Sequence, residues 1–293
     1  MGKDLYESSQ AAKETFDAAN RVLGFDLAAL CFAGPDERLN QTDISQPAIY
    51  VTSVAAYRAA VAAGVLQEAG DVEFAGLSLG EYTALHLAGC FSFEDGLKLV
   101  AARGRYMQEA AVATPSSMVA IMGADEAAVT KLCAENAQGE VLVPANFNAP
   151  GQIVVSGSKA ACDRIAAGAS GSGFKAVPLV VAGAFHSPIM QSGADKMKVE
   201  LARVPFNTPR ATVYSNVTAA PHTDPDNIKK LLVDQIVKPV RWEQTMQQIA
   251  PVDGARFVEL APGRVLTGLL KKINRRIPVE TLSTVAALEG STT

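Results

Sequence analysis

The hydrophobic pattern alternates between runs with helical spacing and short apolar runs bounded by glycine or proline. The stretch from Gly2 to Leu23 has the apolar and charged spacing of an amphipathic helix. Pro47 to Leu66 is rich in alanine and predicts a buried helix, because Arg58 interrupts it and argues against a membrane span. A helix start is expected at 42–47, with Ser45 as its cap and Pro47 in its first turn. Helices that alternate with short strands predict an α/β domain with a mostly parallel sheet covered on both faces.

The pattern changes between residues 117 and 182. Strands are expected at 118–122, 141–146, 152–157 and 174–181, and helices at 125–137 and 159–167. This strand–helix–strand–strand–helix–strand order is typical of a ferredoxin-like unit, whose two ends lie close together. We therefore predict a ferredoxin-like small domain at 114–183, inserted into a large α/β domain formed by 1–113 and 184–293.

The stretch from Val72 to Leu85 carries the strongest local motif. A short apolar run enters Gly76-Leu77-Ser78-Leu79-Gly80, and a helix-forming run leaves it. This is the layout of a nucleophile elbow, which lifts a serine hydroxyl above the end of a sheet. We expect the two glycines to allow close approach of strand and helix, and the helix N-terminus to favour an oxyanion beside Ser78. The alternative is a tight turn with a helix-capping serine.

A long helix is expected at 92–112, with Ser92 as its cap. Its apolar stripe places Arg103 between Val100 and Met107 on the inward face, whereas Arg105 is turned away. A buried guanidinium needs an acceptor, because leaving it unpaired is costly. A structural carboxylate and an anionic substrate are both open as its partner.

A nucleophilic Ser78 would need a base, since an unassisted hydroxyl is a poor nucleophile. Of the three histidines, His86 on the elbow helix is expected to be a packing or surface residue, and His222 an exposed loop residue. His186 ends an apolar run, in the kind of strand-end loop where catalytic groups of α/β sheets gather. It is the candidate base, with a structural histidine as the alternative. An acidic side chain or a backbone carbonyl could orient its ring.

Composition excludes several other classes of protein. A hydrophobic content of 48% and a charged content of 19% describe a soluble globular protein, and the net charge of −4 predicts neither nucleic acid nor an anionic membrane as a partner. The four cysteines are scattered without a Cys-x-x-Cys pair, so we expect no disulfide framework, no zinc site and a reducing compartment. No signal peptide is expected at the start of the chain.

Several motifs resemble one known family in order and at its spacing. They are Gly-Leu-Ser-Leu-Gly-Glu-Tyr at 76–82, Arg103-Gly104, Asn-Phe-Asn-Ala-Pro-Gly-Gln at 146–152, Gly-Ala-Phe-His-Ser at 183–187, Gln235 before Pro-Val-Arg-Trp at 239–242, and Pro-Gly-Arg-Val-Leu at 262–266. Over essentially the whole chain, these motifs resemble the malonyl-CoA:acyl-carrier-protein transacylase family of type II fatty acid synthesis. The resemblance implies a hydrolase-like α/β domain that carries a ferredoxin-like insert.

The resemblance also implies a reaction. Ser78 would attack the malonyl thioester of coenzyme A, and His186 would take its proton while the backbone carbonyl of Gln235 orients the ring. Arg103 would bind the malonyl carboxylate through two contacts, for which a planar guanidinium is well suited. The phosphopantetheine thiol of acyl carrier protein would then take the malonyl group in a ping-pong cycle, with no bound cofactor and no metal.

Three further residues and the setting of the protein follow from the same resemblance. The Leu79 N–H would be one oxyanion donor. Phe185 and Met107 would contact the substrate, and the Phe185 ring would exclude an α-methyl group, although a steric pocket has limited discriminating power. The expected protein is a monomer in the cytoplasm or the plastid stroma, with malonyl-CoA and acyl carrier protein as partners.

The sequence departs from the family pattern at two places. Leu77 stands where most members have a histidine, and we expect a modest effect because that position is not the base. The family also opens with a strand and a Gly-Gln-Gly loop that supplies the second oxyanion donor, whereas this chain matches from just after that loop. Loss of one donor typically costs about 10²–10³ in rate. The expectation is a weak transacylase that a restored upstream segment would recover.

Two alternative functions stay open on the sequence. A serine thioesterase or esterase uses the same serine–histidine chemistry, but an inward Arg103 argues against a neutral ester substrate. A catalytically weakened remnant that binds carrier protein is the other alternative, because the N-terminal oxyanion loop is absent.

Overall fold

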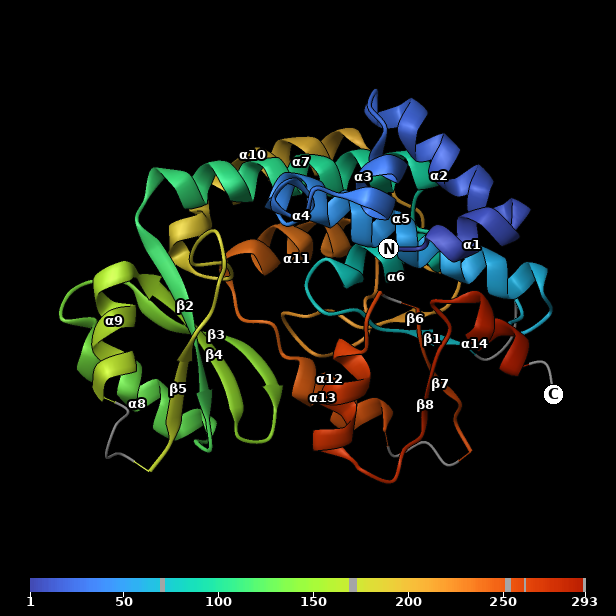
Figure 1. Cartoon of the computed structure of the whole chain (residues 1–293). Coiled ribbons are helices and arrows are strands. Elements are labelled where there is room, and N and C mark those ends of the chain that lie inside the picture. Colours follow the sequence, from blue (N-terminus) through green and yellow to red (C-terminus); the bar gives the residue numbers. More distant parts are fainter. Residues whose placement is uncertain (69–71, 169–172, 251–253, 261, 292–293) are drawn as a thin grey trace. The chain divides into compact units, whose positions relative to one another are not determined.

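The computed structural model describes residues 1–68, 72–168, 173–250, 254–260 and 262–291 (Figure 1). The chain divides into two compact units. The first comprises Met1–Gly104, Val204–Val213 and Val252–Thr293, and the second comprises Arg105–Arg203 and Tyr214–Pro251. The α/β class is confirmed, since helices occur with both parallel and antiparallel strand pairs. The division into domains at 114–183 stays a prediction.

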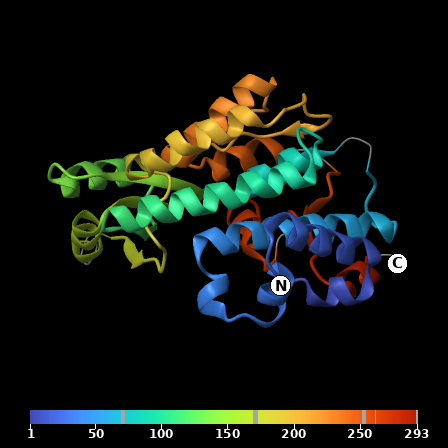
Figure 2. The same ribbon diagram turned by 90° about the horizontal axis from the view of Figure 1, so that it is seen from above.

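Helices make up most of the first unit, and Figure 2 shows those of the N-terminal part, in blue, grouped together. Helix α2 packs on both α1 and α5, so that its apolar stripe is buried. The helices are α1 (Lys3–Ser8), α2 (Gln10–Leu23), α3 (Leu27–Ala33), α4 (Asp36–Leu39), α5 (Thr42–Ala62), α6 (Gly80–Leu87), α13 (Val265–Ile273) and α14 (Val285–Gly290). Helix α7 (Phe93–Ala113) begins in this unit, and the boundary to the second unit falls within it.

The strands of the first unit form two parallel pairs, in keeping with the predicted parallel sheet. Strand β1 (Glu73–Phe74) pairs with β6 (Thr212–Val213), and β7 (Phe257–Glu259) pairs with β8 (Val279–Thr281). Helix α13 lies between β7 and β8 in the chain, and several helices and strands lie between β1 and β6, so both pairs have the crossover connection that parallel pairing requires.

The second unit contains a four-stranded antiparallel sheet in the order β3-β4-β2-β5. Its strands are β2 (Ser116–Met122), β3 (Leu142–Ala149), β4 (Gln152–Ser158) and β5 (Lys175–Pro178). Helices α8 (Glu126–Ala137) and α9 (Lys159–Gly168) lie beside the sheet in Figure 1. They contribute Val129 and Ile165 to a core with Val119 and Val155, which face each other across β2 and β4. The strand and helix order predicted for 118–181 is therefore present.

The opposite face of this sheet carries a smaller apolar cluster. Met118, Ala145 and Val154 are buried there, with Phe185 packed against them. The remaining elements of the second unit are the 3₁₀ helix η1 (Pro188–Met190), α10 (Gln191–Arg203), α11 (Pro225–Val237) and α12 (Trp242–Ile249), and α10 packs against α11.

Several predicted boundaries are wrong. The N-terminal run breaks at Ser9, whose extended backbone and side chain cap α2. Helix α5 begins at Thr42 with Gln41 at its N-cap, so Ser45 is not the cap and Pro47 lies inside the helix. Helix α4, strand β8 and helix α14 were not predicted, because they are too short to show a hydrophobic period.

The four cysteines are buried free thiols. Burial raises the pKa of Cys31 and Cys162 to about 11 and that of Cys90 and Cys133 to about 12. Each therefore behaves as a small apolar side chain at neutral pH. Among the residues that the structure describes, no helix is long and apolar enough to cross a membrane.

The two glycines of the elbow differ in their surroundings. A Cβ added at Gly76 would lie 2.0 Å from the carbonyl carbon of Gly80, whereas a Cβ added at Gly80 would meet nothing within 4 Å. The expected close approach of strand and helix is therefore confirmed for Gly76 and wrong for Gly80. The second glycine of the motif is not required by packing within the described structure.

We predict opposite effects for the two alanine substitutions. Gly76→Ala should lower the free energy of unfolding by about 3 kcal/mol, because the added methyl group overlaps backbone atoms that cannot move cheaply. Gly80→Ala should change it by less than about 1 kcal/mol or increase it slightly, because alanine favours the first turn of α6. Urea unfolding followed by circular dichroism measures both, and equal stability of the two variants would contradict the steric argument.

Candidate active site

Ser78 occupies the sharp turn between β1 and α6. Its φ of 51° lies in the left-handed region, which non-glycine residues rarely adopt, so the turn is strained. Gly80 begins α6 directly afterwards, and the Gly80 N–H donates to Leu77 O at 2.9 Å. The predicted strand–turn–helix context is confirmed. Leu79 stands at the N-cap of α6, where backbone N–H groups lack partners within the helix.

Arg103 lies beside the Ser78 hydroxyl. Its side chain is buried, with 1% exposure, as the inward face of α7 predicts, and Arg105 is exposed. The Arg103 Nη2 donates to Ser78 Oγ at 3.0 Å, and Nη1 donates to Gln46 Oε1 of α5 at 2.7 Å. Both acceptors are neutral oxygens, so these contacts hold the guanidinium in place without cancelling its charge.

The electrostatics around Arg103 favour an anion. Burial lowers the pKa of Arg103, since it removes water from the charged form, and the nearby Tyr82 and Glu81 oppose this effect. The guanidinium carbon lies 5.7 Å from the centroid of the Tyr82 ring. A carboxylate bound at this position would stabilise the charged form.

His186 is held in a second group of residues, in the other unit. It is 4% exposed, and its Nδ1 lies 2.6 Å from the backbone oxygen of Gln235. A carbonyl oxygen only accepts hydrogen bonds, so Nδ1 carries the proton and Nε2 of the neutral ring is left to act as a base.

The chain sequence explains why this carbonyl can orient the ring. Gln235 lies in the last turn of α11, where Pro239 stands four residues further on. Proline has no N–H, so the helix itself supplies no donor for the Gln235 carbonyl. The Gln235 side chain is fully buried, and its Nε2 donates to Asn216 Oδ1 at 3.4 Å.

Hydrogen bonds from two serine side chains to backbone carbonyls also fix the loop that carries His186. The φ of His186 is 58°, again in the left-handed region. Ser156 Oγ donates to Phe185 O and Ser187 Oγ donates to Ala184 O, both at 2.6 Å. These serine hydroxyls satisfy carbonyls that the irregular backbone leaves outside secondary structure.

The other two histidines are largely buried. His86 Nδ1 lies 3.1 Å from Phe91 O, and burial lowers the pKa of this histidine, which agrees with the prediction of a packing residue. His222 is only 9% exposed, so the prediction of an exposed loop residue is wrong. The polar composition of its loop concealed this burial.

Phe185 and Met107 both belong to the second unit. Phe185 packs against Met118, Ala145 and Val154, and Met107 is 2% exposed on α7. Their expected contact with substrate stays a prediction.

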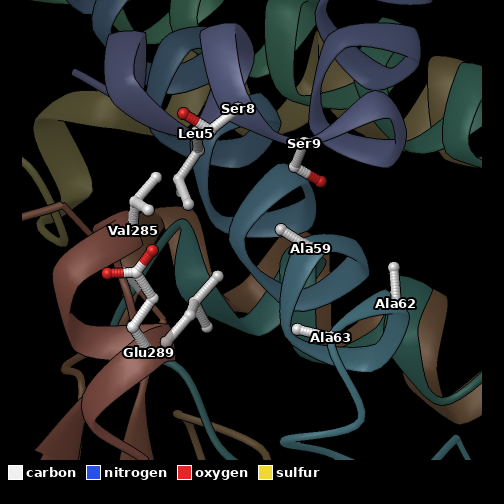
Figure 3. Close-up of a pocket in the computed structure, with 9 residues that line it drawn as sticks. Leu5, Ser8, Ser9, Ala59, Ala62, Ala63, Val285 and Glu289 are labelled. Carbon is white, nitrogen blue, oxygen red and sulfur yellow. The ribbon is translucent and has the colours of Figure 1, made fainter.

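A surface pocket of about 320 Å³ lies elsewhere in the first unit, between α1, α5 and α14 (Figure 3). Leu5, Ala59 and Val285 give it an apolar lining, with Glu289 at one side. No candidate site residue lines this pocket. Within the described residues, no group of three or more histidine, cysteine or acidic side chains is arranged to hold a metal ion.

Comparisons with known proteins identify the family. The model of the acyl transferase domain family matches residues 1–289. The malonyl-CoA–acyl carrier protein transacylase of Escherichia coli strain K12 is 42% identical over 295 residues, which cover 99% of this chain and 92% of that protein. The chain belongs to the malonyl-CoA:acyl-carrier-protein transacylase family. It is an acyltransferase, and the resemblance in the sequence is confirmed.

Solved structures of the family agree with the fold. An acyl-carrier-protein S-malonyltransferase from Vibrio cholerae has a TM-score of 0.93 at 41% identity, with 99% of this chain and 94% of that chain covered. A malonyl transacylase in complex with its type II polyketide acyl carrier protein has a TM-score of 0.93 at 37% identity, with 98% and 93% covered.

Two of the polar contacts in this transacylase were not predicted from the sequence. Gln46 was treated only as part of a helix start, although a glutamine within an apolar, alanine-rich helix signals a buried polar contact. Asn216 lies shortly after β6, and nothing in its local sequence indicates that it contacts Gln235. Contacts of this kind, between residues distant in sequence, can be identified only once the fold is known.

We predict that Gln46→Leu lowers the free energy of unfolding by about 1–3 kcal/mol, because the buried guanidinium of Arg103 loses an acceptor. Tyr82→Phe is the matched control, since it keeps the ring beside the same guanidinium. The Tyr82 hydroxyl is buried without a hydrogen-bond partner among the described residues. Its removal should leave stability unchanged or raise it. Chemical denaturation measures both, and a larger loss for Tyr82→Phe than for Gln46→Leu would contradict this assignment.

Proposed function

We propose that the chain transfers the malonyl group of malonyl-CoA to the phosphopantetheine thiol of acyl carrier protein, through a malonyl ester on Ser78. This reaction supplies malonyl units to fatty acid synthesis. The names of the relatives support it, and so does the relative solved with its carrier protein. The thioesterase and remnant alternatives have no support from these comparisons.

The observation that carries the proposal is the contact between Arg103 and Ser78. The guanidinium is buried and donates to the hydroxyl at 3.0 Å, so a substrate with a carboxylate near its thioester fits a guanidinium placed beside the nucleophile. In malonyl-CoA the carboxylate and the thioester carbonyl are separated by one methylene group. In the proposed complex Arg103 turns from Ser78 to the carboxylate and binds it through two N–H groups.

We assign the proton transfers to His186. Its Nε2 takes the proton of Ser78 as the hydroxyl oxygen attacks the thioester carbonyl, and coenzyme A leaves as the thiol once it has received that proton. The carrier thiol then attacks the malonyl ester with the same histidine as base, and Ser78 is regenerated with its proton. The Gln235 carbonyl keeps Nδ1 protonated throughout, which supports this role.

Leu79 is the proposed oxyanion donor from this chain. Its position at the N-cap of α6 gives its N–H the favourable end of the helix dipole. Phe185 and Met107 are proposed to contact the acyl chain, with Phe185 disfavouring an α-methyl group.

The remaining expectations are proposals of the same kind. The order β3-β4-β2-β5, antiparallel throughout and flanked by α8 and α9, supports a ferredoxin-like small domain at 114–183 within a hydrolase-like large domain. We further propose a monomer in the cytoplasm or plastid stroma that needs neither metal nor bound cofactor.

The decisive experiment is intact-mass spectrometry after brief incubation with malonyl-CoA. The wild-type chain should gain the mass of one malonyl group, and Ser78→Ala should gain none. Addition of holo acyl carrier protein should remove the adduct and yield malonyl carrier protein. A wild-type chain that gains no adduct, or an adduct that persists in Ser78→Ala, would overturn the proposal.

Arg103→Ala should distinguish the transacylase from a thioesterase. Hydrogen bonds to charged groups contribute about 1.5–3 kcal/mol, so the KM for malonyl-CoA should rise about 10- to 150-fold. Transfer of an acetyl group, which lacks the carboxylate, should not fall in proportion. Arg105→Ala on the exposed face of the same helix is the control and should behave as wild type. Unimpaired malonyl transfer by Arg103→Ala would exclude the assigned role.

A further inference from the structure

We propose that Ser156 is a positioning residue for His186. Its hydroxyl holds the peptide group that sets the backbone conformation of His186, and so keeps the ring on the Gln235 carbonyl. This inference rests on the proposed function, because it concerns the base of that reaction.

Ser156 holds the peptide group directly before His186. Ser156 Oγ donates to Phe185 O at 2.6 Å, and this carbonyl belongs to the peptide group that joins Phe185 to His186. The dihedral φ of His186 is the rotation about the bond from that peptide nitrogen to its own Cα. A hydrogen bond that fixes the orientation of the peptide group therefore constrains this rotation.

The backbone conformation of His186 needs such a constraint. The φ of 58° is unfavourable for a residue with a Cβ, so a free loop would relax toward negative φ. That relaxation would swing the imidazole away from its present direction. The ring is held at its other end by the contact of 2.6 Å between Nδ1 and Gln235 O, so backbone and ring must both be fixed for the geometry to persist.

Ser156 itself is held rigidly in the sheet. Ser156 is fully buried on β4, which has strands on both sides, and it pairs with Met118 of β2 and Val143 of β3. Its neighbours Met118 and Val154 belong to the apolar cluster on which Phe185 packs. Side chains on strands hold a functional group more exactly than side chains on loops do.

Two other serines tie the loop one residue earlier. Ser187 Oγ donates to Ala184 O, and the Ala184 N–H donates to Ser116 Oγ at 3.1 Å. Of these three serines, Ser156 is the one whose hydroxyl holds the peptide group directly before His186. We therefore assign the backbone conformation of the base to Ser156 in particular.

The test compares Ser156→Ala with Thr245→Val. Thr245 is equally buried and its hydroxyl donates to Arg241 O at 3.0 Å, so the control also removes one buried hydroxyl-to-carbonyl hydrogen bond, in α12. Ser156→Ala should lower kcat about 10- to 100-fold, since small misplacements of a catalytic group have effects of this size. Its KM for malonyl-CoA should stay within about twofold, because Arg103 still supplies the carboxylate contact. Thr245→Val should retain wild-type kcat.

Proton NMR of the imidazole groups gives a readout independent of turnover. With only three histidines in the chain, the downfield Nδ1 proton of His186 can be assigned. It should be lost or broadened in Ser156→Ala and retained in Thr245→Val. An unchanged resonance, or a kcat within twofold of wild type in Ser156→Ala, would overturn the inference.

A second pair of variants covers the case in which Ser156→Ala does not fold. Ser156→Thr and Ser156→Val have the same shape and differ only in the hydroxyl, so Thr should retain kcat and the resonance while Val loses both. Equal behaviour of this pair would also overturn the inference. If the proposed function itself is wrong, the wild-type chain will form no malonyl ester on Ser78. The NMR comparison does not depend on that reaction, so it still tests whether Ser156 positions His186.

Discussion

A buried positive charge beside the elbow is the constraint on which the first group of site residues depends. Burial of a guanidinium is costly unless hydrogen bonds compensate for the lost water. Gln46 from α5 and Ser78 from the elbow supply neutral acceptors, and the Tyr82 ring lies beside the guanidinium. Three separate segments are thus fixed around Arg103. The proposed nucleophile Ser78 and the proposed substrate-binding residue Arg103 are positioned by the same contacts.

Both proposed reacting residues have left-handed backbone conformations, and each is held by a different device. At Ser78 the constraint is steric: the backbone of Gly80 lies so close to Gly76 that a side chain at position 76 would overlap it. At His186 the device is a set of hydrogen bonds, from Ser156 to the backbone and from the ring to the Gln235 carbonyl. Such strain persists only where the surrounding structure fixes it, and it is concentrated at functional sites.

Local pattern was enough to predict much of this arrangement. Strand–turn–helix spacing located the elbow, and helical periodicity placed Arg103 inward and Arg105 outward, because both signals depend on residues within one or two turns. The element order of 118–181 was also predictable, because glycine, proline and polar residues separate its short apolar runs. The two parallel pairs of the first unit could not be assigned, because β1 and β6 are two residues long and meet only through the fold.

Long-range polar contacts could not be predicted from the sequence either, because only the fold brings their partners together. Gln46 meets Arg103 across 57 positions, and Ser156 meets Phe185 across 29. A buried His222 within a polar loop was missed because burial depends on which elements cover the loop and not on its composition. The orienting role of Gln235 entered through family resemblance, although Pro239 four residues later was a signal that could have been found from helix geometry alone.

Charge and not shape should dominate substrate selection in this transacylase. A steric pocket that rejects one additional methyl group discriminates by about 1–3 kcal/mol, which is the scale of the effect proposed for Phe185. Each charge-assisted hydrogen bond from Arg103 to a carboxylate contributes about 1.5–3 kcal/mol, and an acyl group without a carboxylate would lose both bonds of the proposed contact. An acidic side chain in the place of Gln46 would compete with the substrate for the guanidinium, whereas the neutral amide of Gln46 carries no opposing charge. Discrimination between malonyl and acetyl groups is therefore expected to exceed discrimination between malonyl and methylmalonyl groups.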